Sequence, residues 1–148
     1  QICNLAATVA NRGYFYSLHV VHNIQNGSID PIYREKHYTG VDRRWYEYCV
    51  AGMRKAVLDG TCRAANLPGY EDGQDGYGTN RGHDHSVFMG FAPMQQPRIA
   101  VSVYVENGGF GNVYGVPIGA LIMEQYLKWQ TFSFVRKEST TFSHLHIN

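Results

Sequence analysis

The clearest hydrophobic pattern lies between residues 85 and 106, in two runs separated by a short turn. The run "HSVFMGFAP" is short, apolar and closed by Pro93, which is typical of a buried strand. The run "RIAVSVYVE" alternates, with one face made of Ile99, Val101, Val103 and Val105 and the other of Ala100, Ser102, Tyr104 and Glu106. The linking "MQQP" is short and ends in proline, so the two runs predict an antiparallel hairpin.

Three other stretches predict helices. Asp42 can cap a helix from Arg43 to Leu58, which the pair "DG" at residues 59–60 ends. Its predicted apolar stripe consists of Trp45, Tyr48, Cys49, Gly52, Met53, Ala56 and Val57. A short first helix is predicted by the spacing of Ile2, Leu5, Ala6 and Val9. A last helix has Pro117 in its first turn and carries Ile118, Leu121, Ile122 and Tyr126.

The remaining stretches give weaker patterns. Aromatic and β-branched residues in "YFYSLHVVHNI" predict a strand or extended arm that ends at the turn-like "QNGS". After Trp129 neither period continues, and an arm, a strand or an unrelated extension all fit the tail. We predict one domain of the α+β class, with helices packed on a small antiparallel sheet.

Composition narrows the classes of function. The chain has 148 residues, of which 44% are hydrophobic and 17% charged, and its formal net charge is +1. These values indicate a globular domain, and no Lys/Arg stripe supports nucleic-acid binding. No run reaches the roughly 18 apolar residues of a membrane span, and the first residues lack the basic start of a targeting peptide. Cys3, Cys49 and Cys62 form no C-x-x-C pair, so we predict buried free thiols.

Several runs carry a resemblance to a known family. "DHSVFMGFAP", "QPRIAVSVYVENGGFG" and "VPIGALIMEQYL" resemble the C-terminal part of the transpeptidase domain of class B penicillin-binding proteins, the elongation type that crosslinks peptidoglycan. Upstream, "LAATVANRGYFYSLHVV" and "VAGMRKAVLDGTCRAANLPG" are similar to the stretches before the family's third strand. We therefore predict a partial transpeptidase-like domain at residues 1–128 and a C-terminal extension at residues 129–148.

The resemblance implies a five-stranded antiparallel sheet with helices on both faces, of which this chain holds at least a three-stranded part. It also implies an acyl-transfer site with three motifs: Ser-x-x-Lys for the nucleophile, Ser-x-Asn for proton transfer and Lys-Thr-Gly for the substrate carboxylate. None of the three occurs in the sequence. The first two lie upstream of residue 1 in the family, so we expect part of a longer domain without catalytic residues. The family is membrane-anchored and extracytoplasmic, whereas this sequence shows no anchor or signal.

The Lys-Thr-Gly position should fall within "EDGQDGYGTN", residues 71–80. Gly78 and Thr79 align with the Gly-Thr end of the family pattern and are predicted to be vestigial substrate-binding residues. Gly76 and Tyr77 then stand where lysine and threonine belong, so the cation that binds the substrate carboxylate is missing. Asp75 adds negative charge at the same place.

The acidic loop and the histidines give only weak indications of a metal. Glu71, Asp72 and Asp75 are oxygen ligands of the calcium kind, but their spacing is not that of an EF-hand and Asp-Gly pairs are common in turns. Each close histidine pair lacks a third zinc ligand in the sequence: His19 with His22, His83 with His85, and His144 with His146. We predict no cofactor and no metal.

Three functions fit these observations. The first is a catalytically inactive relative of the transpeptidase domain with a binding or structural role, in which Asp84, His85 and Ser86 are structural, as the resemblance implies. His85 opens a strand, so we expect it to bond to nearby backbone. The second is half of a D,D-transpeptidase site that a missing segment completes. The third is a small protein-binding module. In the family's sheet the strand "RIAVSVYVE" is interior, so we expect its open edge to pair with the tail from Thr131 to Ile147 or with a second copy, giving a homodimer.

Overall fold

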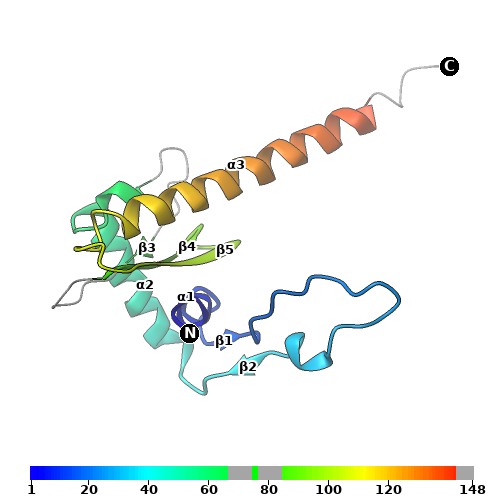
Figure 1. Ribbon diagram of the computed structural model, residues 1–148, viewed down its shortest axis with the longest axis horizontal. Coiled ribbons are helices and arrows are strands. Elements are labelled where there is room, and N and C mark those ends of the chain that lie inside the picture. Colours follow the sequence, from blue (N-terminus) through cyan, green and yellow to red (C-terminus); the bar gives the residue numbers. More distant parts are fainter. Residues whose placement is uncertain (67–74, 77–84, 143–148) are drawn as a thin grey trace.

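A computed structural model describes residues 1–66, 75–76 and 85–142 of the chain. In chain order its elements are α1 (Ile2–Ala10), β1 (Tyr14–Phe15), the 3-10 turn η1 (Pro31–Tyr33), β2 (His37–Tyr38), α2 (Arg43–Leu58), the 3-10 turn η2 (Arg63–Ala65), β3 (Asp75–Gly76), β4 (Ser86–Ala92), β5 (Ile99–Val105) and α3 (Gly115–Phe142). Figure 1 shows three layers, in which α3 covers one face of the β4–β5 hairpin and α1 covers the other. The predicted α+β class is confirmed.

The hairpin of β4 and β5 forms the centre of the molecule. The two strands pair antiparallel along their whole length, from Ser86 opposite Val105 to Ala92 opposite Ile99. The short strand β3 pairs with the other edge of β4, which gives a three-stranded sheet in the order β3-β4-β5. Both the hairpin and the small antiparallel sheet that the sequence predicted are therefore present. The strands β1 and β2 form a second, two-stranded antiparallel sheet.

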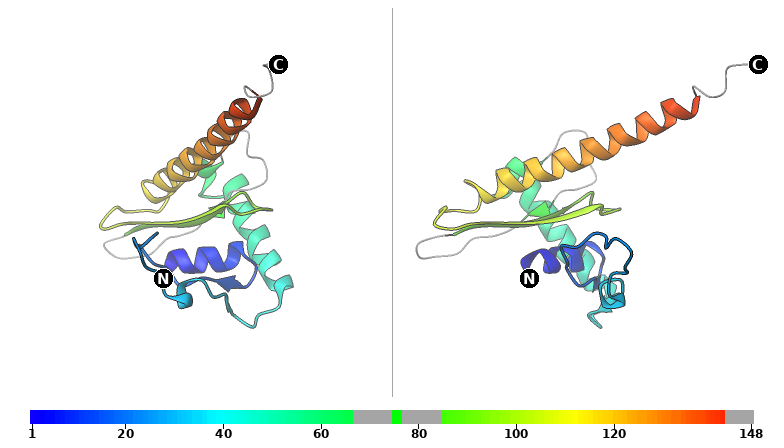
Figure 2. Two further views of the ribbon diagram at one scale, coloured as in Figure 1. Left: turned by 90° about the vertical axis from the view of Figure 1, so that its right-hand side faces the viewer. Right: turned by 45° about the vertical axis from the view of Figure 1, so that its right-hand side comes forward.

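Alternation along β4 divides the core into two clusters, because successive residues of a strand point to opposite faces. Phe88 and Ala92 lie in the cluster beneath α3, together with Val101 and Val103 of β5. Phe91 lies in the cluster on the other face, with Met89 packed against it. That second cluster also contains Val9, Ala10, Val50 and Met53 from the first two helices. Figure 2 shows the sheet as a thin layer between α3 and α1.

The helix α2 has the predicted bounds and the predicted cap. The Asp42 carboxylate accepts a hydrogen bond from the backbone N–H of Arg44 at 2.9 Å, which satisfies one of the unpaired donors of the first turn. The C-cap is Asp59, the first residue of the "DG" pair. Local capping chemistry was thus sufficient to fix this helix.

The predicted buried face of α2 is wrong at its N-terminal end. Trp45, Tyr48 and Cys49 are exposed, and the two rings contact each other with centroids 5.9 Å apart. The buried stripe is Val50, Met53 and Val57, which have helical spacing and reach both core clusters. Apolar residues on two sides of the helix left the sequence pattern ambiguous, and contacts with α1 and the hairpin decide which side is buried.

The predicted apolar face of α3 is also wrong. The side chains that it buries are Val116, Ala120, Met123 and Leu127. The predicted Ile118, Leu121, Ile122 and Tyr126 are exposed instead. The first half of this helix is apolar on most sides, so its sequence period does not identify the buried face.

Three further expectations concern the two ends of the chain. The first helix is confirmed, but Ile2 and Leu5 at its start are exposed. The predicted extended run after it is a strand only at Tyr14–Phe15. The helix α3 continues to Phe142, so residues 131–142 are helical, and the strand that was one alternative for the tail does not form there. No helix in the described part of the chain has the length and hydrophobicity of a membrane span.

A close approach between α3 and β4 fixes the position of the helix on the sheet. Gly119 lies against the ring of Phe88, and a Cβ atom at this glycine would come within 3.0 Å of the Phe88 Cδ1 and Cε1 atoms. Gly115, one turn earlier, would place a Cβ 3.2 Å from the backbone nitrogen of the same phenylalanine. The helix can lie this close to the strand because both positions lack a side chain.

We predict that Gly119→Ala lowers the free energy of unfolding by about 1–3 kcal/mol, the usual cost of overpacking a core. The matched control is Gly52→Ala in α2, where a Cβ meets no atom within 4 Å. Because alanine favours a helix more than glycine does, the control should gain about 0.5–1 kcal/mol. Urea unfolding of both variants tests this, and a stability of Gly119→Ala equal to that of the parent would contradict the close packing.

Candidate functional site

Two residues of the stretch expected to hold the Lys-Thr-Gly position, Asp75 and Gly76, form the edge strand β3 of the described sheet. The strand β3 pairs antiparallel with β4, so that Asp75 lies opposite Phe91 and Gly76 opposite Gly90. This edge is the one farther from β5. Residue 76 is glycine, so it brings no ammonium group to the edge. The other predicted residues of this region lie outside the described residues: Glu71, Asp72, Tyr77, Gly78, Thr79, His83 and Asp84.

Ser86, the first residue of β4, is fully buried and joins three parts of the chain. Its hydroxyl donates to the backbone carbonyls of Phe110 at 3.0 Å and Gly111 at 3.3 Å. Its oxygen accepts the backbone N–H of Gly115 at 2.8 Å, at the start of α3. The hydroxyl thus gives the N–H at the start of α3 a buried partner, and it adds a bond to two loop carbonyls that also accept the N–H groups of Val113 and Val116. The structural role that the resemblance implied for Ser86 agrees with this geometry.

His85, which immediately precedes β4, holds the turn after β5. Its Nδ1 atom accepts the backbone N–H of Asn107 at 3.0 Å, and its ring centroid lies 5.1 Å from that of Tyr104. Asn107 has a φ of 54°, so this bond holds a residue in the left-handed region. The expectation that His85 bonds to nearby backbone is confirmed.

Two other described histidines, His37 and His19, contact polar groups or aromatic rings. His37 lies 3.2 Å from the Ser17 hydroxyl through its Nε2 atom, and it stacks on Phe15. His19 lies against Tyr33, with the ring centroids 4.9 Å apart. Among the described residues, no three of the types His, Cys, Asp and Glu gather closely enough to hold a metal ion.

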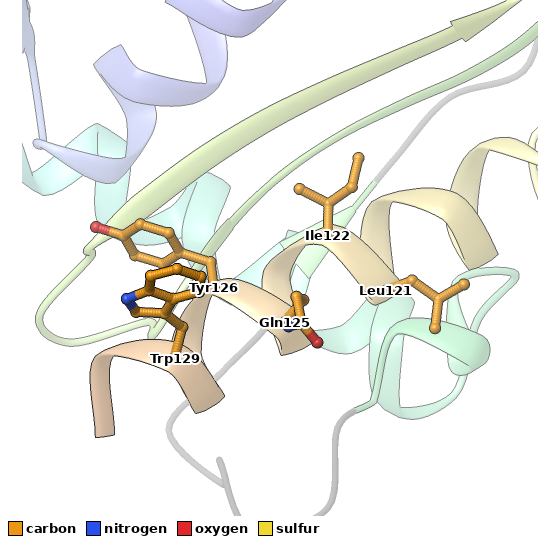
Figure 3. Close-up of a pocket in the computed structure, with 5 residues that line it drawn as sticks. All are labelled: Leu121, Ile122, Gln125, Tyr126 and Trp129. Carbon is orange, nitrogen blue, oxygen red and sulfur yellow. The ribbon is translucent and has the colours of Figure 1, made fainter. Parts of the chain in front are cut away.

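The outer face of α3 carries an apolar hollow of about 540 Å³. Figure 3 shows its lining residues, which all project from the helix: Leu121, Ile122, Gln125, Tyr126 and Trp129. The described lining residues carry no charged group, so this part of the hollow offers apolar contact.

A second hollow, of about 420 Å³, is polar and lies beside the end of α1. Arg12, one of its lining residues, donates to the carbonyls of Ala10 at 2.7 Å and Met94 at 3.0 Å, and its Nε atom lies 3.4 Å from the carboxylate of Glu47. Arg43 pairs with the same carboxylate. Arg12 therefore joins α1, α2 and the hairpin turn, and its charge is already compensated.

The three cysteines occupy different environments, which partly corrects the prediction of buried thiols. Only Cys62 is buried, whereas Cys3 is half-buried and Cys49 is exposed. Burial raises the pKa of the Cys62 thiol, since the thiolate would lose its hydration, and a hydrogen bond from Thr61 offsets this only in part. Cys62 is accordingly an unreactive core residue rather than a nucleophile.

Comparison with known proteins identifies the family. The model of the penicillin-binding protein transpeptidase domain matches residues 1–127. The chain belongs to this family. Its relatives are of class B, as the resemblance suggested.

The chain matches only part of each relative. The peptidoglycan D,D-transpeptidase PbpA of Mycobacterium tuberculosis is 29% identical over 139 residues, which is 84% of this chain and 28% of that protein. The structure of Pseudomonas aeruginosa PBP2 in complex with WCK 5153 has a TM-score of 0.71 and 30% identity, and the match covers 84% of this chain and 29% of the other. A penicillin G acyl-enzyme complex of penicillin-binding protein A from M. tuberculosis has a TM-score of 0.63 and 25% identity, over 84% and 31% of the two chains. The chain thus spans less than a third of these proteins.

Sequence reasoning missed the residues that seat α3 on the sheet. Gly115 and Gly119 are four residues apart, so they lie one turn apart on the same face of the helix. Two glycines with this spacing at the start of a predicted helix are a usable signal for a close approach of another backbone or ring. The pattern of apolar residues alone directed the prediction to the opposite face.

We predict that Ser86→Ala lowers the free energy of unfolding by about 1–3 kcal/mol, because it leaves the Gly115 N–H buried without its partner and removes the bonds from the hydroxyl to the two carbonyls. The control is Ser28→Ala, an exposed serine, which should change stability by less than about 0.5 kcal/mol. Thermal unfolding followed by circular dichroism measures both. Equal stability of the two variants would show that the hydroxyl is not a structural junction.

We predict that a thiol reagent at pH 8 modifies Cys49 in the folded chain and leaves Cys62 unmodified until the chain unfolds. Because the pKa of Cys62 is raised, the fold favours the protonated thiol, and this preference stabilises the folded chain at neutral pH. The stabilisation is lost as the pH rises above about 8.5, the pKa of an unfolded thiol. Peptide mass mapping measures the modification, and Cys62→Ala should remove this part of the alkaline destabilisation. Rapid native labelling of Cys62 would contradict its burial.

Proposed function

We propose that this chain is a catalytically inactive relative of the penicillin-binding transpeptidase domain and that its role is binding or structural. The observation that carries the proposal is the run Gly-Tyr-Gly-Thr at residues 76–79, which aligns with the family's Lys-Thr-Gly position and lacks its lysine. Acyl transfer in the family uses this lysine to hold the substrate carboxylate, and Gly76 brings no ammonium group to the same edge of the sheet.

The roles of the polar residues near the hairpin support the same proposal. Ser86 and His85 are used by backbone groups of the loop and the turn, so neither is available as a nucleophile or base. Cys62 is buried beneath α3, away from solvent. Among the described residues, the apolar outer face of α3 offers a surface for contact with a partner.

A second candidate function is half of a D,D-transpeptidase site, completed by a segment that carries the nucleophile. The apolar hollow on α3 and the exposed Ile2 and Leu5 of α1 favour it, because they are surfaces that further structure could cover. The chain spans less than a third of its relatives, which is compatible with this candidate. The missing lysine at residue 76 favours a binding role over this candidate.

We predict that a fluorescent penicillin leaves the chain unlabelled, since no serine of the sequence has a lysine three residues after it. The double variant Gly76→Lys/Tyr77→Thr, which restores Lys-Thr-Gly-Thr at residues 76–79, should remain unlabelled too. The positive control is penicillin-binding protein A from M. tuberculosis, whose structure has been solved as a penicillin G acyl-enzyme complex. An increase in intact mass by one acyl group in either form of this chain would refute the inactive assignment.

A further inference from the structure

Positive charge gathers in the polar hollow beside the end of α1. The end of α1, the start of α2 and the turn of the β4–β5 hairpin line this hollow of about 420 Å³, which is a usual size for a small-molecule site. Three of its described lining residues are arginines, Arg12, Arg43 and Arg98, and two are amides of the turn, Gln95 and Gln96. None of the described lining residues is acidic. The hollow is therefore rich in hydrogen-bond donors and positive charge.

Arg12 is the buried donor of the hollow. Only 6% of its side chain is exposed, and its two terminal nitrogens donate to the carbonyls of Ala10 and Met94. Each terminal nitrogen of a guanidinium carries two N–H groups, so these bonds use one N–H of each. The second N–H of each nitrogen has no partner among the described residues. Because Arg12 lines the hollow, an acceptor bound there can take up these two donors.

The charges at the hollow do not balance. Arg12 and Arg43 share one carboxylate, that of Glu47, at 3.4 and 3.5 Å. Arg98 forms no ion pair with a described residue. Three guanidinium groups thus lie beside one carboxylate, which leaves two positive charges that a bound anion can neutralise.

We propose that this hollow binds a phosphate group with two negative charges, as carried by a phosphate monoester. Guanidinium groups bind phosphate oxygens through short, charge-assisted hydrogen bonds, and the planar fork of arginine suits this geometry. A dianion matches the two uncompensated charges, whereas a carboxylate would leave one of them. Gln95 and Gln96 bring further amide donors, and Tyr14, which also lines the hollow, offers an aromatic surface to the rest of the ligand.

The site is separate from the features that carry the proposed function. None of its described lining residues belongs to the stretch aligned with Lys-Thr-Gly or to the outer face of α3. Phosphate binding therefore does not depend on whether the chain is catalytically inactive. The demand for an oxyanion is set by the arginines themselves, and any further segment of a longer protein that lined the hollow would have to meet it with acceptors.

Titration with phenyl phosphate tests the site, and benzoate is the matched probe because it carries the same ring and a singly charged carboxylate. At about pH 7.5 the phosphate is doubly charged, since its second pKa is about 6. Isothermal titration calorimetry at low ionic strength should give a Kd of about 1 mM for phenyl phosphate, as two or three charge-assisted hydrogen bonds would provide. Benzoate should bind about tenfold more weakly, because it neutralises one charge fewer.

Either of two results of this titration would overturn the proposal. The first is no saturable binding of phenyl phosphate up to about 10 mM, a concentration at which a Kd of about 1 mM gives near saturation. The second is equal affinity for benzoate, which would exclude a site built for a dianion.

Two neighbouring arginines of α2 distinguish a site from general attraction to positive charge. Arg43 lines the hollow, whereas Arg44 pairs with Asp42, lies over the Trp45 ring and is not a lining residue. Their side chains are 77% and 69% exposed, so neither substitution should disturb the fold, which circular dichroism verifies. Arg43→Gln should weaken phenyl phosphate binding by about tenfold and Arg44→Gln by less than about twofold. Equal effects of the two variants would overturn the site.

Amide chemical shifts locate the bound phosphate. In the parent chain, the backbone amide signals of Asn11 and Gln96 should move in proportion to the phenyl phosphate bound, because both residues line the hollow. The signal of Gly52, in the middle of α2, should stay in place. Binding that moves neither Asn11 nor Gln96 would place the phosphate elsewhere on the chain and overturn the proposal.

Discussion

The contact of α3 with β4 is the constraint on which the rest of the structure depends. Gly119 and Gly115 let the helix come down onto Phe88, and the Ser86 hydroxyl binds the N–H at the start of the same helix. The close packing of the glycines thus fixes the distance between the helix and the sheet. The hydrogen bond fixes the residue at which the helix begins. With α3 in this position, Met123 and Leu127 are fully covered and the first core cluster closes over β5.

The other face of the sheet depends on β4 in the same way. Phe88 points to α3, while Phe91 points to α1, so one strand contributes the largest fully buried ring to each cluster. Arg12 then joins the end of α1 to the hairpin turn through the Met94 carbonyl and to α2 through Glu47. Because the layers share β4, we expect their stabilities to be coupled rather than independent.

Patterns that are local in sequence predicted their elements correctly. The alternation in β5 and the Asp42 cap of α2 need only neighbouring residues, and both were confirmed. The buried faces of α2 and α3 were not predicted, because apolar residues lie on several sides of these helices and the choice is made by partners distant in sequence. Trp45 and Leu121 are exposed for this reason, although their hydrophobicity alone favoured burial. At the candidate site, the role of His85 followed from its place at the start of a strand, whereas the seating of Gly119 on Phe88 required the tertiary structure.

The described contacts that hold the layers together do not use the positions of the transpeptidase motifs. A chain with glycine at residue 76 can therefore retain the family's hairpin and C-terminal helix. The central claim is that α1, the sheet and the first half of α3 form one cooperative unit through β4. Native-state hydrogen exchange tests it most directly. The backbone amides of Val9, Phe88 and Met123 should exchange with the same free energy of opening, equal to that of global unfolding. A much lower free energy for Met123 than for Phe88 would show that α3 opens separately and would contradict the account.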